Sequence, residues 1–128
     1  MVADASEPRI LLVEDDSGVR LLAERVMQRL GYEVRVASSA EEALKSLTED
    51  ARPLDLLVTD LVMPGMSGRE LASTLRALQP GLRVLFTSGY ASDQVLRRGI
   101  TADDDQTFLE KPFAPEELER ALRRALDG

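Results

Sequence analysis

Residues 10–16 read Ile-Leu-Leu-Val-Glu-Asp-Asp, an apolar run that ends in three acidic residues. The run is too short for a helix, and its aliphatic side chains favour a strand that is covered on both faces. Apolar residues at helical spacing follow the acidic turn, and Gly31 suits the C-terminal end of that helix. These apolar positions are Val19, Leu22, Ala23, Val26, Met27 and Leu30. A buried strand, an acidic turn and an amphipathic helix therefore follow one another at the start of the chain.

The alternation of strand and helix patterns continues to the end of the chain. Further strand patterns lie at 32–36, 54–59, 82–87 and 107–110, and further helix patterns lie at 40–47, 67–78, 92–98 and 115–126. Strands that alternate with helices in this way pair in parallel through right-handed crossovers. The pattern predicts a (βα)₅ fold, which is a doubly wound α/β domain with one five-stranded parallel sheet between two layers of helices.

Serine residues mark two of the predicted helix starts. Ser39 precedes Glu42 by three residues, and Ser67 precedes Glu70 by the same distance, which is the spacing of a capping box. Behind Ser67, three leucines at helical spacing are expected to face the core, and these are Leu71, Leu75 and Leu78. The helix at 92–98 has few apolar residues, so we expect it to be the most mobile element.

The composition excludes several kinds of site. The 128 residues include no histidine and no cysteine, which rules out an imidazole base, a His-ligated zinc ion, and disulfide or thiolate chemistry. The net charge of −7 argues against non-specific attraction to nucleic acid. No apolar run approaches the ~20 residues of a membrane span, and the first residues do not form a secretory signal. We therefore expect a cytoplasmic chain with a flexible tail at 1–8 and a single domain at 9–127.

Side chains able to perform chemistry lie at the ends of four predicted strands. In chain order they are Glu14 and Asp15, then Asp60, then Thr87, and finally Lys111. Since the carboxyl ends of parallel strands share one edge of the sheet, we expect these side chains to converge. Clustered carboxylates repel one another, and a divalent cation bound by oxygen atoms relieves that repulsion. The absence of histidine and cysteine ligands favours Mg²⁺, with Mn²⁺ as an alternative.

This set of groups is suited to phosphoryl transfer. A carboxylate beside a divalent cation can attack phosphorus and form an acyl phosphate. Asp60 is the strongest candidate nucleophile because it lies alone at the end of a central strand. The cation and Lys111 would neutralise charge on the phosphoryl group, and Thr87 would donate a hydrogen bond to one of its oxygens.

Four motifs in these segments resemble those of bacterial response-regulator receiver domains. They are LLVEDD at 11–16, VTDLVMPGMSG at 58–68, TSGY at 87–90 and KPF at 111–113. The resemblance covers nearly the whole chain, and the motifs occur in the family's order. It implies the flavodoxin-like receiver fold with strand order 2-1-3-4-5 and a cis peptide bond between Lys111 and Pro112. It also implies transfer of a phosphoryl group from a partner's phosphohistidine to one aspartate.

The resemblance assigns roles to individual residues. It places a metal site on three carboxylates and one backbone carbonyl, which are those of Glu14, Asp15, Asp60 and Val62. It makes Asp60 the phosphoacceptor, Lys111 its charge partner, and Thr87 and Phe108 the switch residues. Glu14 stands where aspartate is commoner in the family, so we expect its contact with the metal to run through water. Phe108 lacks a hydroxyl group, so its switch would act through packing alone.

The resemblance implies a signalling role with protein partners. A histidine kinase or a histidine phosphotransfer protein would supply the phosphoryl group, and a downstream protein would bind the surface at 88–108. The chain would be a monomer or a weak dimer that dephosphorylates itself slowly, rather than an enzyme with turnover. It would be either a single-domain response regulator or the receiver domain of a hybrid sensor histidine kinase. We expect no DNA-binding output domain after Asp127.

Two other functions compete with this hypothesis. A pseudo-receiver would bind proteins independently of phosphorylation, but the complete set of site residues argues against it. A small phosphohydrolase would need a second acid beside Asp60 and a cap over its substrate, and the sequence offers neither. The acidic run at 103–105 is interpreted as a solvated loop rather than a second metal site.

Overall fold

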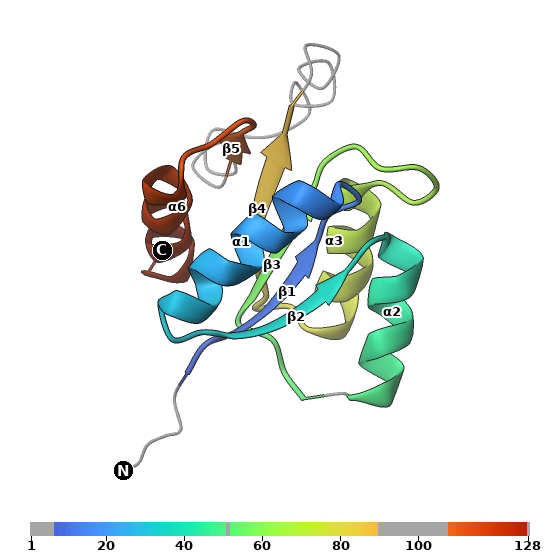
Figure 1. Cartoon of the computed structure of the whole chain (residues 1–128). Helices are drawn as coiled ribbons and strands as arrows, with labels where there is room; N and C mark the ends of the chain where they lie inside the picture. Colours follow the sequence, from blue (N-terminus) through green and yellow to red (C-terminus); the bar gives the residue numbers. More distant parts are fainter. Residues whose placement is uncertain (1–6, 51, 90–107, 128) are drawn as a thin grey trace.

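The computed structural model describes residues 7–50, 52–89 and 108–127. Its elements are, in chain order, β1 (Arg9–Val13), α1 (Ser17–Arg29), β2 (Glu33–Ala37), α2 (Ala40–Glu49), β3 (Leu56–Asp60), α3 (Gly68–Leu78), β4 (Arg83–Ser88), β5 (Phe108–Glu110) and α6 (Pro115–Asp127). Neighbouring strands pair in parallel, and the sheet has the order β2-β1-β3-β4-β5 (Figure 1). The predicted doubly wound α/β fold and its strand order are thereby confirmed.

The predicted elements agree with the structure wherever the chain is described. Each predicted strand is present, with limits that differ by one or two residues from the sequence pattern. The predicted helix at 92–98, the acidic run at 103–105 and most of the tail at 1–8 lie outside the described residues, as does most of the surface at 88–108. None of the described helices is both long and apolar enough to span a membrane.

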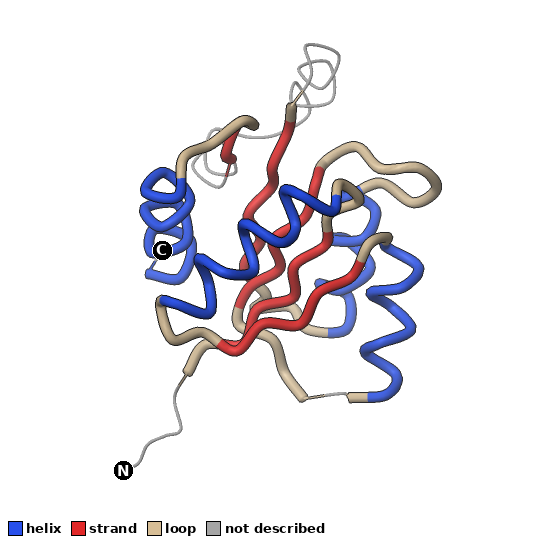
Figure 2. The backbone as a smooth tube through the Cα atoms, viewed as in Figure 1, coloured by secondary structure: helices blue, strands red, loops and turns tan. Residues whose placement is uncertain are grey.

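The sheet separates two layers of helices. Helices α1 and α6 cover one face, and α2 and α3 cover the other (Figure 1, Figure 2). Alternate residues of β1 serve the two faces, so Leu11 belongs to the core beneath α2 and α3, whereas Leu12 belongs to the core beneath α1 and α6. Strands β1 and β3 lie inside the sheet, and β3 is buried along its whole length. The near-continuous apolar sequence of these two strands reflects that two-sided burial.

Serine caps begin α2 and α3, but the two caps differ. At α3, Ser67 and Glu70 form the predicted capping box, in which each side chain accepts a hydrogen bond from the other residue's backbone N–H. At α2, Ser39 accepts from the backbone N–H of Glu42 at 3.0 Å. The Glu42 carboxylate accepts from the backbone N–H of Ser38 at 2.7 Å. A full capping box would need the Glu42 carboxylate to accept from the backbone N–H of Ser39. That part of the prediction was wrong, because the carboxylate reaches Ser38, one residue farther back along the chain.

Two leucines predicted to face the core are exposed instead. Leu22 of α1 is 39% exposed, and Leu78 of α3 is 76% exposed. Leu22 lies at the border of the apolar stripe of α1, whose buried residues include Ala23 and Val26. Leu78 is the last residue of α3, so the helical spacing carries it past the end of the core.

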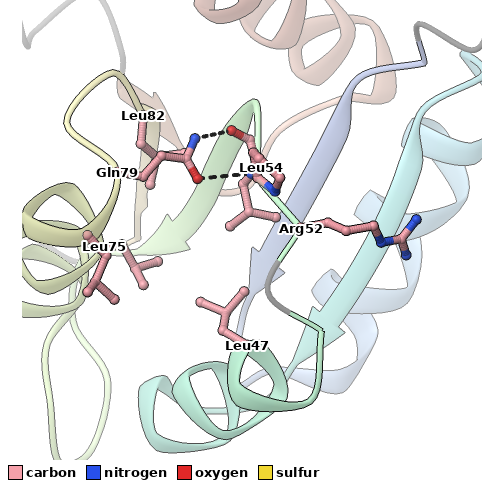
Figure 3. Close-up of a pocket in the computed structure, with 8 residues that line it drawn as sticks. Leu47, Arg52, Leu54, Leu75, Gln79 and Leu82 are labelled. Carbon is pink, nitrogen blue, oxygen red and sulfur yellow. Dashed lines mark hydrogen bonds between the residues drawn. The ribbon is translucent and has the colours of Figure 1, made fainter.

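A hollow of about 340 Å³ lies between α2 and α3, next to Leu78 (Figure 3). Its walls include leucines of α2 and α3 and of the segments that lead into β3 and β4, namely Leu47, Leu75, Leu54 and Leu82. The side-chain amide of Gln79 spans one wall, because its Oε1 accepts from the Leu54 backbone N–H at 3.0 Å and its Nε2 donates to the Leu54 carbonyl. This double contact fastens the end of α3 to the segment that leads into β3.

The start of α3 packs tightly on the end of β3. The backbone N–H of Gly68 donates to the carbonyl of Leu61 at 3.0 Å. A Cβ atom added to Gly68 would lie 2.0 Å from the carbonyl oxygen of Asp60 and 3.2 Å from the Cα atom of Leu61. Only glycine allows this approach without moving backbone atoms, so Gly68 helps to set the position of Asp60.

Replacement of Gly68 should therefore destabilise the fold. We expect Gly68→Ala to lower the free energy of unfolding by about 2 kcal/mol or more, because backbone atoms must shift to admit the methyl group. The matched control is Gly81→Ala, since a Cβ atom at Gly81 would meet nothing within 4 Å. Urea denaturation followed by circular dichroism compares the two variants, and equal losses of stability would contradict this reading of Gly68.

Candidate functional site

Three carboxylates meet at the carboxyl end of the sheet. Glu14 and Asp15 follow β1, and Asp60 ends β3, its neighbour in the sheet. The three residues offer carboxylate oxygens that all lie within 4.8 Å of one another. Glu14 and Asp60 are buried, with 2% and 5% exposure, whereas Asp15 is exposed. The strand order thus brings together the carboxylates that the sequence places at these strand ends.

Lys111 supplies the positive charge that faces two of these carboxylates. Its Nζ lies 2.9 Å from Oδ2 of Asp60, and 3.2 Å and 3.4 Å from the two carboxylate oxygens of Glu14. The backbone N–H of Lys111 donates to the carbonyl of Ser88 at 2.7 Å, which ties the residue to the end of β4. The peptide bond between Lys111 and Pro112 is cis, as the resemblance implied. One ammonium group is therefore shared between two buried acids.

Burial and mutual repulsion leave the acids incompletely compensated. Burial raises the pKa of Glu14 to about 7, and the charge of Asp60 adds to the rise, while the Asp16 backbone N–H and Lys111 oppose it. Burial also raises the pKa of Asp60, against the hydrogen bonds that it receives from Lys111 and from the Val62 backbone. Burial alone would lower the pKa of Lys111, but its contacts with Asp60 and Glu14 outweigh that effect and raise it.

The donor set fits a hard divalent cation. Mg²⁺ prefers carboxylate, carbonyl and water oxygens in an octahedral arrangement. Glu14, Asp15 and Asp60 are close enough together to share one ion, and a bound cation would offset the burial and repulsion that raise the pKa of Glu14 and Asp60. These carboxylates would hold the ion, and the backbone carbonyl of Val62 is the fourth candidate ligand.

The two candidate switch residues lie on neighbouring strands. Thr87 is 3% exposed and pairs with Asp60 in the register of β3 and β4. The backbone N–H of Leu61 donates to the Thr87 carbonyl at 2.8 Å. Phe108 pairs with Phe86 in the register of β4 and β5, and the centroids of their rings are 5.8 Å apart. Thr87 is thus beside Asp60, whereas Phe108 is two strands away and contacts the core through Phe86.

Two further residues contact this site: Arg20, which the sequence did not single out, and Gly89, which belongs to the TSGY motif at 87–90. The guanidinium group of Arg20 in α1 donates to the carbonyl of Glu14 at 2.8 Å and so holds the acidic turn. A Cβ atom at Gly89 would lie 3.3 Å from Cε of Lys111, so a small residue leaves room for the lysine. The contact of Arg20 has no motif signal, because it depends on the path of the chain around the site.

Comparison with known proteins gives the same family throughout. Residues 10–123 match the family described as the response regulator receiver domain. Sensor kinase CckA of Brucella abortus is 39% identical over 92% of this chain, which spans 12% of that protein. The response regulator receiver protein CpdR of the same organism is 35% identical over 92% of this chain, which spans 96% of that protein. The crystal structure of the receiver domain of hybrid histidine kinase CckA superposes with a TM-score of 0.72 and 35% identity, covering 92% of this chain and 98% of that one.

The raised pKa of Glu14 predicts how stability depends on pH in the metal-free protein. The folded protein holds a proton on Glu14 up to about pH 7, whereas the unfolded chain releases it near the ordinary value of 4.5. Stability should therefore increase as the pH falls from about 8 to about 5.5, because the folded state takes up a proton that the unfolded state does not.

Glu14→Gln removes this titration and serves as the reference. We expect the glutamine variant to be more stable than the wild type at about pH 8. This difference in the free energy of unfolding should be smaller at about pH 5.5, by an amount on the order of 1 kcal/mol. Denaturant titrations without divalent cations measure the difference at both pH values. A difference that stays constant with pH would show that Glu14 does not titrate in this range.

Proposed function

The chain belongs to the response regulator receiver domain family of two-component signalling, and we propose that it is a phosphoacceptor switch in which Asp60 takes a phosphoryl group from a phosphohistidine. The observation that carries this proposal is the contact of 2.9 Å between Asp60 Oδ2 and Lys111 Nζ inside a cluster of three carboxylates. An acid exposed on the surface needs no ammonium partner, because water solvates its charge. A buried acid with a purely structural role would not lie beside two further carboxylates, because burying uncompensated charge is costly.

The environment of Asp60 supports a role as nucleophile. A carboxylate must be ionised to attack phosphorus, and burial opposes ionisation. The Lys111 ammonium and the Val62 backbone N–H stabilise the ionised form of Asp60. In the transfer, a new bond forms between an Asp60 oxygen and phosphorus while the bond between phosphorus and the donor imidazole nitrogen breaks. When bound, Mg²⁺ would neutralise the negative charge of the phosphoryl oxygens.

The signal would pass from Asp60 to its neighbours in the sheet. The hydroxyl group of Thr87, one strand away, would donate a hydrogen bond to a phosphoryl oxygen. Movement of β4 would then alter the packing of Phe108 against Phe86, and with it the surface around 88–108. Since a phenylalanine ring forms no hydroxyl hydrogen bond, this switch acts through shape alone.

The partners follow from this chemistry. A histidine kinase or a histidine phosphotransfer protein in the cytoplasm would supply the phosphoryl group, and the exposed apolar side chains of Leu21, Leu22 and Val62 are available for contact with it. The receiver domain at 9–127 stores the group as a monomer or weak dimer and releases it by slow hydrolysis, without substrate turnover. The similarity to CckA and CpdR supports two contexts, a hybrid sensor histidine kinase and a single-domain response regulator.

Loss of the acceptor oxygen should abolish phosphorylation. We expect the wild type to gain one phosphoryl group from acetyl phosphate or phosphoramidate when Mg²⁺ is present, and Asp60→Asn to gain none, because an amide is a poor nucleophile. The matched control is Asp16→Asn, which keeps a capping side chain at the start of α1 and should be phosphorylated like the wild type. Intact-protein mass spectrometry measures the gain. Absence of any gain in the wild type with both donors would contradict the proposal.

Loss of the Thr87 hydroxyl should uncouple acceptance from the conformational change. We expect Thr87→Ala to accept the phosphoryl group but to show much smaller chemical-shift changes at the amides of β4 and β5 than the phosphorylated wild type. Thr87→Ser keeps the hydroxyl group and should restore the changes. Two-dimensional NMR of each phosphorylated protein tests this, and equal shift changes in the alanine variant would remove Thr87 from the switch.

A further inference from the structure

The loop between β3 and α3, residues 61–67, is fastened at both ends. At its start, the backbone N–H of Leu61 donates to the Thr87 carbonyl at 2.8 Å. At its end, the backbone N–H of Gly68 donates back to the Leu61 carbonyl at 3.0 Å. Val62 lies between these two residues, and 41% of its surface is exposed.

A side chain from another element holds the far part of this loop. Glu41, in the first turn of α2, accepts a hydrogen bond from the backbone N–H of Met66 through Oε2 at 3.2 Å. Gly65 has a φ of +79°, and a Cβ atom there would lie 3.0 Å from Glu41 Oε2 and 3.5 Å from Oε1. The carboxylate therefore lies directly against the backbone of two consecutive loop residues, and the positive φ of the first favours glycine there.

We propose that Glu41 is a positioning residue for the metal site, because it sets the course of the loop that carries the Val62 carbonyl. The inference rests on the proposed function, in which that carbonyl is an oxygen ligand of Mg²⁺. Glu41 itself lies outside the group of three carboxylates that could hold an ion in the described part of the chain. Its effect would be transmitted through Met66 and the loop backbone.

The chemistry of Mg²⁺ makes such positioning consequential. The ion demands a nearly ideal octahedral arrangement of ligands, so a carbonyl on a displaced loop binds it less well. A hydrogen bond from a backbone N–H to a carboxylate is stronger than one between neutral groups. The same loop also bears the Val62 N–H, which stabilises ionised Asp60. Release of the loop would therefore disturb a metal ligand and the nucleophile together.

The test must separate position from charge, because removal of any nearby negative charge weakens cation binding. Glu41→Ala removes both the charge and the hydrogen-bond acceptor, whereas Glu41→Gln removes the charge and keeps an acceptor oxygen. Glu42→Gln removes an equal charge from the adjacent residue, whose carboxylate binds Ser38 instead of the loop. Circular dichroism first verifies that every variant is folded.

Two measurements on these variants decide the proposal. Titration with Mg²⁺, followed by NMR, gives the dissociation constant of the ion. Hydrogen exchange of the Met66 amide in the metal-free protein reports the contact itself, independently of metal and activity. We expect Glu41→Ala to bind Mg²⁺ about three- to tenfold more weakly than Glu41→Gln and to exchange the Met66 amide faster than the wild type. Glu41→Gln and Glu42→Gln should have equal affinities within about twofold.

The contrary outcomes are distinct from failure of the proposed function. Equal Mg²⁺ affinity in Glu41→Ala and Glu41→Gln would overturn the positioning role, because charge alone would then account for the effect. Unchanged exchange of the Met66 amide in Glu41→Ala would overturn it as well. A wild type that binds no Mg²⁺ would overturn the proposed metal site, while the exchange measurement would still decide whether Glu41 holds the loop.

Discussion

The burial of two neighbouring acids, Glu14 and Asp60, is the constraint around which the carboxyl edge of the sheet is built. Both acids end strands that are neighbours inside a sheet covered on both faces, so neither can move away into water. Lys111 relieves part of the repulsion by contacting both acids. Burial still raises the pKa of each carboxylate, with a further rise at Glu14 from the charge of Asp60 and at Asp60 from the charge of Asp15, and a bound cation would offset these effects. The juxtaposition of these acids thus follows directly from the order of the strands.

Several local features hold this edge in place against the repulsion. Gly68 lets α3 approach the Asp60 carbonyl, and Arg20 holds the Glu14 carbonyl from α1. Lys111 is tied to β4 through its own backbone, so its ammonium group is delivered from a fixed position. The two apolar cores, one on each face of the sheet, need no such polar contacts, because alternate apolar residues of the strands pack against the helices on both faces. The polar restraints are therefore concentrated where the charges are, as expected for a site assembled at the expense of local stability.

The parts of the structure that sequence reasoning could reach are those set by periodicity and strand ends. Alternating strand and helix patterns were enough for the doubly wound fold, and parallel pairing was enough to bring Glu14, Asp60 and Lys111 to one edge. Periodicity failed at Leu22 and Leu78, since it does not say where a helix leaves the core. The contact between Glu41 and the loop at Met66 joins residues 25 positions apart and depends on the path of an irregular loop. No local pattern encodes such a path.

The groups that would accept the phosphoryl group and those that would transmit the signal lie at different depths in the fold. Acceptance would depend on Asp60, which ends β3, and on Lys111, which directly follows β5 and whose backbone N–H donates to the Ser88 carbonyl. Transmission would depend on β5, a strand of three residues at the border of the sheet, where Phe108 is only partly buried against Phe86. A short border strand has fewer contacts to lose, so its opening requires less free energy than any change at β3. Under the proposed function, a small shift at Thr87 would therefore alter the packing of Phe108 while Asp60 keeps its place at the end of β3.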